Sequence, residues 1–135
     1  GRINEREYLG RMDMTILTSI SEGQPLTILE SYAAHKPVIA TDVGNCRELI
    51  YGEKEGEKPA GILTHIMNLE EISEAMVELA ENGKMRKDLG EAGYERVING
   101  YKVQDMKRVY RGIYQEFSQK RKEEWSEQPF RIKKP

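Results

Sequence analysis

The chain has 135 residues, of which 33% are charged, and its mean hydropathy is -0.71. This length fits one domain or part of a larger protein, and no apolar run approaches the roughly 20 residues of a membrane-spanning helix. The single cysteine, Cys46, excludes an internal disulfide and a multi-cysteine metal site. Nothing at the start resembles a signal peptide, so we expect a cytoplasmic protein.

The net charge of -2 hides an uneven distribution. Residues 1–101 contain 11 Lys and Arg against 18 Asp and Glu, whereas residues 102–135 contain 10 against 5. A basic segment of this kind can contact an acidic surface or a membrane, although a solvated helix end is the more common explanation. Nucleic acid is not an expected partner, because no basic patch alternates with aromatic residues elsewhere.

Helices and strands are predicted to alternate in the first half of the chain. A short helix is expected over residues 5–12, with Asn4 as its cap. Apolar and β-branched runs predict strands over 14–20, 37–41 and 60–65. Between them, helices are predicted over 25–35, with Leu26, Leu29 and Ala33 on one face and Pro25 in the first turn, and over 45–52. The charged, Gly-rich run 51–61 is expected to be an exposed loop.

The second half of the chain is predicted to be helical. A helix with a capping start at Asn68 follows from the spacing of Leu69, Ile72, Met76 and Leu79. A second helix is expected over 84–98. A third carries an apolar stripe of Val103, Met106, Tyr110, Ile113 and Phe117. Residues 120–135 lack periodicity and are expected to fray or to dock elsewhere, together with Trp125 and Phe130.

Strands that alternate with helices predict the α/β class, with parallel strands joined by right-handed crossovers. Only three strands are visible, whereas a doubly wound nucleotide-binding domain has five or six. We therefore expect an incomplete doubly wound, Rossmann-like sheet of about three strands flanked by helices. Its remaining strands are expected upstream of Gly1, which would leave a sheet edge uncovered.

The stretch "EGQPLTILE" places two carboxylates, Glu22 and Glu30, on either side of a helix start. Open α/β sheets bind ligands at the carboxyl ends of their strands. Free N–H groups near Leu26 and Thr27 would hold an anion such as a diphosphate, and the flanking carboxylates would accept hydrogen bonds from ribose and sugar hydroxyls. By this pattern alone, the more common explanation is a loop acid at Glu22 and a surface helix acid at Glu30.

A longer match along the chain favours the ligand-binding explanation of Glu22 and Glu30 instead. The pieces "LTSISEGQPLTILESYAA", "KPVIATDVGNCRELI", "AGIL" and "LEEISEAMVELAENGKMRKDLGEAGYERV" closely resemble the C-terminal half of a family four glycosyltransferase. That family consists of retaining, nucleotide-sugar-dependent enzymes of the GT-B fold. The resemblance covers about residues 1–117 and implies that they form the C-terminal portion of the nucleotide-sugar-binding domain, with 118–135 as a basic tail. "SEGQPL" and "GNCRELI" most resemble the branch that builds Pel-type exopolysaccharide, for which UDP-glucose is the expected donor.

The resemblance also implies roles for single residues. Glu22 matches the acid near the reacting centre, and Glu30 matches the acid that takes the ribose hydroxyls. Gly23 would let the backbone approach the donor, next to Gln24 and Pro25. The amides of Leu26 and Thr27 would help to hold the diphosphate. No metal or other cofactor is implied.

The implied reaction is transfer of a glucosyl unit with retention, by front-face attack of a glycan acceptor hydroxyl as the nucleoside diphosphate leaves. Negative charge develops on that diphosphate, so its stabilisation is the main electrostatic task. The family's basic Arg and Lys pair comes from the first part of the domain, and neither that part nor the N-terminal acceptor domain is in this chain. We therefore expect the isolated chain to bind a donor weakly and to catalyse nothing.

Three further residues have structural explanations. His35 stands where the family usually has Gly at a left-handed helix end, a conformation that His tolerates with modest strain. His65 is expected to be a loop residue, because no second ligand stands at metal-binding spacing. Cys46 lies near a helix start that could lower its pKa, but a small, partly buried side chain is the safer expectation.

Two other functions remain open from the sequence. One is a non-catalytic interaction module that uses the open sheet edge and the basic last helix to bind a partner or to self-associate. The other is a related GT-B enzyme that epimerises UDP-sugars. "EGQPLTILE" followed by "GNCRELI" favours transfer over epimerisation.

Overall fold

The computed structural model describes the backbone of residues 5–127 and the side chains of residues 7–121. The elements in chain order are α1 (Glu5–Leu9), β1 (Thr15–Leu17), α2 (Leu26–Ala33), β2 (Val38–Thr41), α3 (Cys46–Tyr51), β3 (Gly61–Thr64), α4 (Leu69–Glu81), α5 (Gly83–Gly100) and α6 (Val103–Glu127). The chain divides after Tyr101 into two compact units. Asn4, the expected cap of the first helix, lies outside the described residues.

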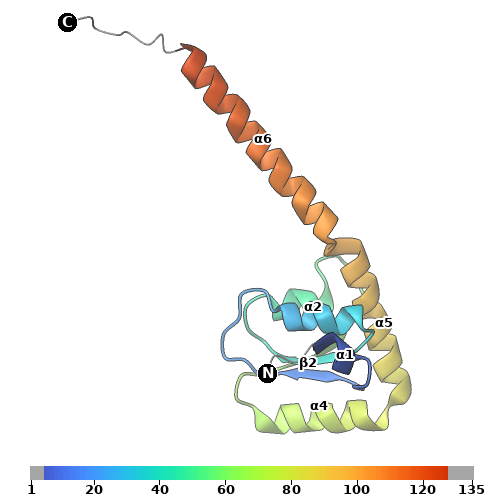
Figure 1. Ribbon diagram of the computed structural model, residues 1–135. Coiled ribbons are helices and arrows are strands. Elements are labelled where there is room, and N and C mark those ends of the chain that lie inside the picture. The colour runs from blue at the N-terminus through green and yellow to red at the C-terminus, as the bar shows by residue number, and fades with distance from the viewer. Residues whose placement is uncertain (1–4, 128–135) are drawn as a thin grey trace, which may run out of the picture. The chain divides into compact units, whose positions relative to one another are not determined.

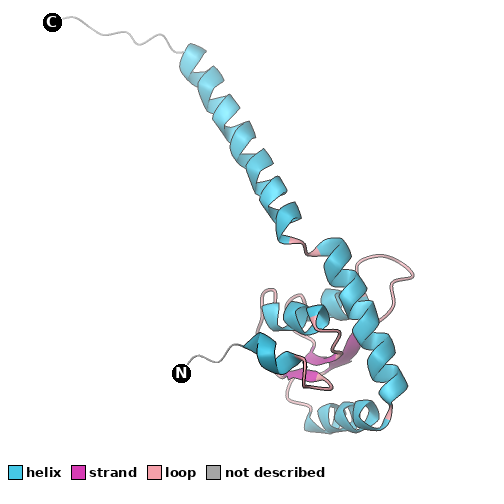
Figure 2. Cartoon of the chain, turned by 45° about the vertical axis from the view of Figure 1, so that its right-hand side comes forward, coloured by secondary structure: helices cyan, strands magenta, loops and turns pink. Residues whose placement is uncertain are grey.

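The first unit is built on a three-stranded parallel sheet in the order β1-β2-β3 (Figure 2). Thr15 pairs with Val38 at the start of β1, and Thr41 pairs with Thr64 at the end of β3. All four residues of β2 are buried, because a central parallel strand is covered on both faces. The predicted α/β class with an open sheet of three parallel strands is confirmed.

Helices cover the two faces of this sheet unequally (Figure 1). Val38 and Ala40 of β2 pack in one apolar cluster with residues of α2, α3 and α5. Ile39, which points the other way, packs with Ala75 and Leu79 of α4 and with Leu89 of α5. Side chains alternate across a strand, so β2 ties both layers together.

The buried faces of two helices differ from those predicted. In α2 the core residues are Ile28 and Tyr32, both fully buried, whereas Leu26 is 68% exposed. In α4, Ile72 and Leu79 are buried as predicted, but Leu69 is 79% exposed. Both leucines stand at the first position of their helix, where the chain has just left the sheet edge and nothing in the described structure covers them.

Helix ends agree closely with the sequence where polar side chains cap them. The Asn68 side chain accepts a hydrogen bond from the Glu71 N–H at 3.2 Å, which confirms the predicted capping start of α4. His35 follows α2 with a φ of 55°, the left-handed conformation expected for that position. Its ring stacks on Tyr94 with a centroid separation of 3.8 Å, and its Nδ1 lies 3.0 Å from a carboxylate oxygen of Glu91. These contacts to α5 offset the strain of the left-handed backbone.

β1 lies at an edge of the sheet, and within the described residues it pairs with β2 alone. Its middle residue, Ile16, is 39% exposed, as expected for an edge strand with no further neighbour. α1 ends at Leu9, three residues before the predicted end. β1 is also shorter than predicted, because the chain leaves the sheet after Leu17.

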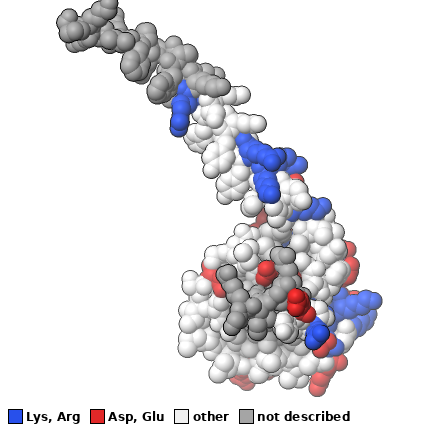
Figure 3. All heavy atoms as spheres, viewed as in Figure 1, with Lys and Arg blue, Asp and Glu red and all other residues white. Residues whose placement is uncertain are grey.

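The second unit contains α6, which continues ten residues beyond Phe117. The prediction that helical structure ends near that residue is therefore wrong. The predicted apolar stripe is present and exposed, with Tyr110 at 55% and Phe117 at 67%. Lys and Arg side chains lie along the same helix (Figure 3), and among its described side chains Arg108 pairs with Asp105 and Lys120 with Glu116. No described helix is long and apolar enough to cross a membrane. The Trp125 side chain and Phe130 lie outside what the structure describes.

Candidate functional site

The loops that follow β1, β2 and β3 lie at one edge of the sheet, because the strands are parallel and end in register. The loop after β1 carries Glu22 and leads into α2. The turn after β2 carries Gly44 and Asn45 and leads into α3. This edge is where open α/β sheets bind their ligands.

Glu22 is half-buried in the β1–α2 loop, three residues before Pro25. The Ser19 hydroxyl donates a 2.6 Å hydrogen bond to its Oε1. The second carboxylate oxygen has no hydrogen-bond partner among the described residues, so one oxygen is fixed and the other can accept a ligand hydroxyl.

Gly23 and Gln24 are both exposed, but they face different surroundings. The space beside the Gly23 Cα is open, with nothing within 4 Å of where a Cβ would stand. Its carbonyl accepts a 3.0 Å hydrogen bond from the Asn45 N–H. Gln24 instead lines a separate cleft beside α3.

The N-terminus of α2 has no side-chain cap. Pro25 is its N-cap residue, with φ -74° and ψ 108°, so helix α2 begins one residue later than predicted. No acidic side chain lies in the first turn. The N–H groups of Leu26 and Thr27 precede the first intrahelical donor, Ile28, whose N–H bonds to the Pro25 carbonyl at 3.2 Å. They are therefore open to an anion.

Glu30 lies one turn further along α2 and is half-buried. Its carboxylate makes no hydrogen bond or ion pair with another described side chain. Because residues four apart share a helix face, Glu30 lies on the same side of α2 as exposed Leu26. Glu22 thus lies in the loop before the uncapped start of α2, and Glu30 lies within the helix after it.

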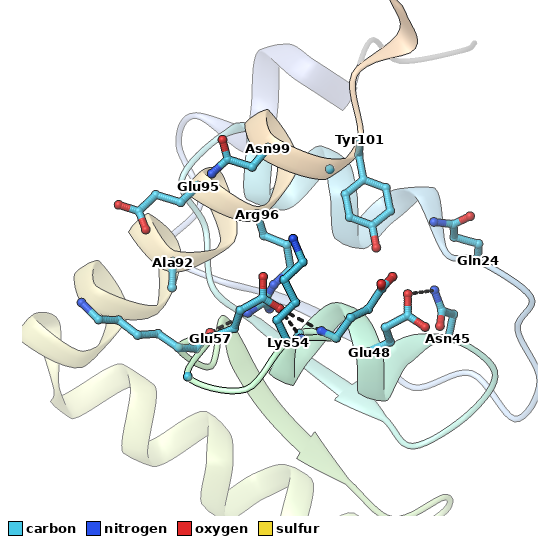
Figure 4. A pocket seen from close by; sticks show the side chains of 15 residues that line it. Gln24, Asn45, Glu48, Lys54, Glu57, Ala92, Glu95, Arg96, Asn99 and Tyr101 are labelled. Atoms are coloured by element: carbon cyan, nitrogen blue, oxygen red, sulfur yellow. Dashed lines mark hydrogen bonds between the residues drawn. The ribbon is translucent and has the colours of Figure 1, made fainter. Parts of the chain in front are cut away.

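A cleft of about 590 Å³ opens beside this edge, between α3, the loop that follows it and the C-terminal end of α5. Gln24, Asn45, Glu48 and Tyr101 lie at one end of it (Figure 4). A hydrogen bond with Glu48 raises the pKa of the Glu53 carboxyl at this end. Burial and the charges of those two glutamates raise the pKa of Tyr101. The cleft could not be predicted from the sequence, because the residues that line it lie up to 77 positions apart, from Gln24 to Tyr101.

The surroundings of Cys46 and His65, two other residues noted in the sequence, agree with structural roles. Cys46 is fully buried, and burial raises the pKa of its thiol, so the helix start does not activate it. His65 is exposed, and its Nδ1 lies 2.8 Å from the Glu71 carboxylate. Among the described residues, no group of three or more His, Cys, Asp and Glu is placed to hold a metal ion.

Comparison with known proteins assigns the family. Residues 1–96 match the family model described as glycosyl transferases group 1. The chain belongs to the glycosyl transferases group 1 family. This match covers the sheet, the Glu22 loop and most of α5, which together carry the candidate site.

Individual relatives agree with this family. An uncharacterised glycosyltransferase of Methanocaldococcus jannaschii is 33% identical over 65% of this chain and 24% of its own length. The N-acetyl-alpha-D-glucosaminyl L-malate synthase of Bacillus anthracis is 26% identical over 82% of this chain and 28% of its own length. The chain thus spans about a quarter of the length of these group 1 relatives.

A solved structure shows the fold. The sucrose-phosphate synthase of Thermosynechococcus elongatus superposes with a TM-score of 0.68 at 22% identity. The match covers 79% of this chain and 27% of that enzyme. Family membership does not favour the alternative of a non-catalytic interaction module.

Proposed function

We propose that this chain forms part of the donor site of a retaining hexosyltransferase. The donor is a nucleoside-diphosphate sugar, with UDP-glucose as the first candidate, and the sugar passes to a glycan acceptor in exopolysaccharide synthesis. One observation carries the proposal: two carboxylates that form no ion pair with any described side chain flank an uncapped helix N-terminus at the carboxyl edge of a parallel sheet. Family membership supports it.

In this proposal each group has a separate task. The free oxygen of Glu22 accepts a hydrogen bond from the donor sugar. The amides of Leu26 and Thr27 hold the diphosphate with the positive end of the α2 dipole, which stabilises charge as the leaving group departs. Glu30 accepts hydrogen bonds from the ribose hydroxyls. Residues 118–135 would serve as a basic tail, and the isolated chain would bind its donor weakly and remain inactive.

Substitution of Glu30 tests the ribose assignment. We expect Glu30→Ala to weaken UDP binding about tenfold or more, because a hydrogen bond to a charged group contributes on the order of 1.5–3 kcal/mol. Isothermal titration of UDP into the chain, and into a full-length parent where the gene encodes one, measures the effect. Glu78→Ala, an exposed acid on α4, removes the same charge far from the site and should leave the UDP affinity unchanged.

Substitution of Glu22 should distinguish binding of the sugar from binding of the nucleotide. We expect Glu22→Gln to weaken binding of UDP-glucose while UDP binds almost as before, because only the sugar reaches this carboxylate. An equal loss for both ligands would show that Glu22 does not contact the sugar. An unchanged UDP affinity in Glu30→Ala would show that the ribose assignment is wrong.

A further inference from the structure

The loop that carries Glu22 is held from the neighbouring strand. Thr41, the last residue of β2, is 1% exposed, and its hydroxyl donates a 2.5 Å hydrogen bond to the Ser19 carbonyl. The Leu17 carbonyl lies 3.5 Å from the same hydroxyl. A hydroxyl has one proton, so the shorter contact to Ser19 is the effective bond. A buried side chain of β2 thus fixes the β1–α2 loop where it leaves the sheet.

Ser19 links the bond from Thr41 to the carboxylate of Glu22. While Thr41 holds its carbonyl, the Ser19 hydroxyl donates to Oε1 of Glu22 at 2.6 Å. A charge-assisted bond of this length restricts the side chain to one orientation. The free carboxylate oxygen therefore has a set direction before any ligand arrives.

The turn after β2 holds the other end of the loop. The Asn45 N–H donates to the Gly23 carbonyl at 3.0 Å. Gly44 has a φ of 52°, and a Cβ added there would lie 2.0 Å from the Glu22 carbonyl oxygen. Any other residue at 44 would push the Glu22 backbone away, besides its strained left-handed conformation.

We propose that Thr41, Ser19 and Gly44 are positioning residues that pre-organise Glu22, so that β2 and its following turn form the template for the donor-contacting loop. The identity of the ligand rests on the proposed function; the template itself does not. Pre-organised groups bind with less ordering of the protein, which is why the constraint matters for affinity.

The sheet supplies a matched control for Thr41. Thr64 pairs with Thr41 in the register of β2 and β3 and is 4% exposed. Its hydroxyl bonds to the Ala40 carbonyl at 3.4 Å and has no bond to the Glu22 loop. Thr41→Val and Thr64→Val therefore remove the same group from equivalent strand positions with equal change in shape.

Amide hydrogen exchange of the folded chain tests the template without any ligand. The Asn45 N–H reports directly on its bond to Gly23. We expect about tenfold faster exchange of this amide in Thr41→Val and in Ser19→Gly, no change in Thr64→Val, and recovery in Thr41→Ser, which keeps the hydroxyl. Equal exchange in Thr41→Val and wild type, or equal acceleration by Thr64→Val, would overturn the template.

Titration of the same variants with UDP-glucose and UDP tests whether the pre-organisation of Glu22 affects donor affinity. We expect Thr41→Val to weaken UDP-glucose binding at least several-fold, with a smaller effect on UDP and with recovery in Thr41→Ser. If the wild-type chain and parent bind neither ligand, the proposed function fails while exchange still decides the template. If Thr41→Val does not fold, Ser19→Ala is the second variant, and it too should weaken the binding of UDP-glucose more than that of UDP. Equal ligand affinities in Ser19→Ala and wild type would overturn the positioning of Glu22.

Discussion

At the scale of single residues, Tyr32 shows how a polar group is placed in the core. Its side chain is fully buried on α2, and its hydroxyl donates to the Leu49 carbonyl at 3.1 Å. Gly93 of α5 faces the ring, where an added Cβ would lie 2.4 Å from a ring carbon. Burial raises the pKa of the phenol well above its usual value near 10. Tyr32 therefore ties α2, α3 and α5 together only while it stays protonated.

The contribution of Tyr32 to stability should depend on pH in the alkaline range. Below pH 10 the phenol is neutral in both folded and unfolded chains, so its contribution to stability is complete. As pH rises above 10, the unfolded chain ionises first, and the free energy of unfolding should fall by up to about 1.4 kcal/mol per pH unit. In Tyr32→Phe that slope should become smaller, because Cys46 and Tyr101, whose pKa values are also raised, still contribute to it. About 1 kcal/mol should be lost at pH 8 from the missing hydrogen bond.

Urea denaturation at pH 8 and above pH 10 measures these differences. Tyr114→Phe, at an exposed position on α6, is the control and should keep the wild-type pH dependence. The same alkaline slope in Tyr32→Phe and wild type would show that Tyr32 does not couple ionisation to folding.

At the scale of elements, Arg96 joins α5 to the end of α3 and to the loop that follows. Its Nη1 donates to the carbonyls of Leu49 and Ile50 at 2.5 and 2.9 Å, and its Nη2 donates to that of Lys58 at 2.6 Å. The first two carbonyls belong to the last turn of α3, where a helix lacks internal donors. A guanidinium can reach all three carbonyls at once because its donors are fixed in a plane.

Replacement of Arg96 should loosen that region. We expect Arg96→Met to lower the free energy of unfolding by about 3 kcal/mol, because three hydrogen bonds from a charged donor are lost. The Leu49 and Ile50 carbonyls keep their bonds from the Tyr32 hydroxyl and the Ala60 N–H. Arg96→Lys should recover only part of this, since an ammonium cannot span the same carbonyls. Chemical denaturation gives the values, with Lys87→Met, an exposed position on the same helix, as the control. A full recovery by Lys would show that charge, rather than the planar geometry, is what matters.

At the scale of the whole molecule, the core belongs to one unit. Every residue of the two apolar clusters lies between Met14 and Tyr101. In α6, by contrast, the apolar side chains from Val103 to Phe117 remain 44–70% exposed. Among the described residues, the buried apolar contacts therefore lie within the first unit.

Removal of residues 102–135 tests this division. We expect the shortened chain to unfold within about 3 °C of the wild-type temperature, because no buried side chain is lost. It should also self-associate less in sedimentation measurements, since an exposed apolar stripe has been removed. A fall in unfolding temperature of 10 °C or more would mean that α6 supports the first unit.

Local pattern was enough to predict much of this protein. Runs such as "PVIAT" mark the strands and Asn68 marks a helix start, because each depends on the chemistry of a few neighbouring residues. The left-handed conformation of His35 was expected from the resemblance, since the family usually has Gly there. The two acids of "EGQPLTILE", with the stretches that follow, indicated the family. The assignment of Glu22 and Glu30 to a donor remains a prediction.

Some faces and contacts could not be predicted in this way. Periodicity placed Leu26 in the core, whereas the structure buries Ile28 and Tyr32, because the neighbouring helices α3 and α5 decide which side of α2 is covered. The length of α6 was underestimated, since a charged, exposed helix carries little apolar signal beyond Phe117.

The sequence by itself determined the class of fold and the order of its elements, because these follow from local chemistry and spacing. The resemblance to a family singled out the two acids, whose roles stay a prediction. The tertiary structure alone decided how Glu22 is held. Thr41 and Gly44 lie about 20 residues away in the chain, and only the parallel pairing of β1 with β2 brings them against the loop. Bonds between loops of neighbouring strands leave no periodic trace in a sequence, so they become visible only when the sheet has formed.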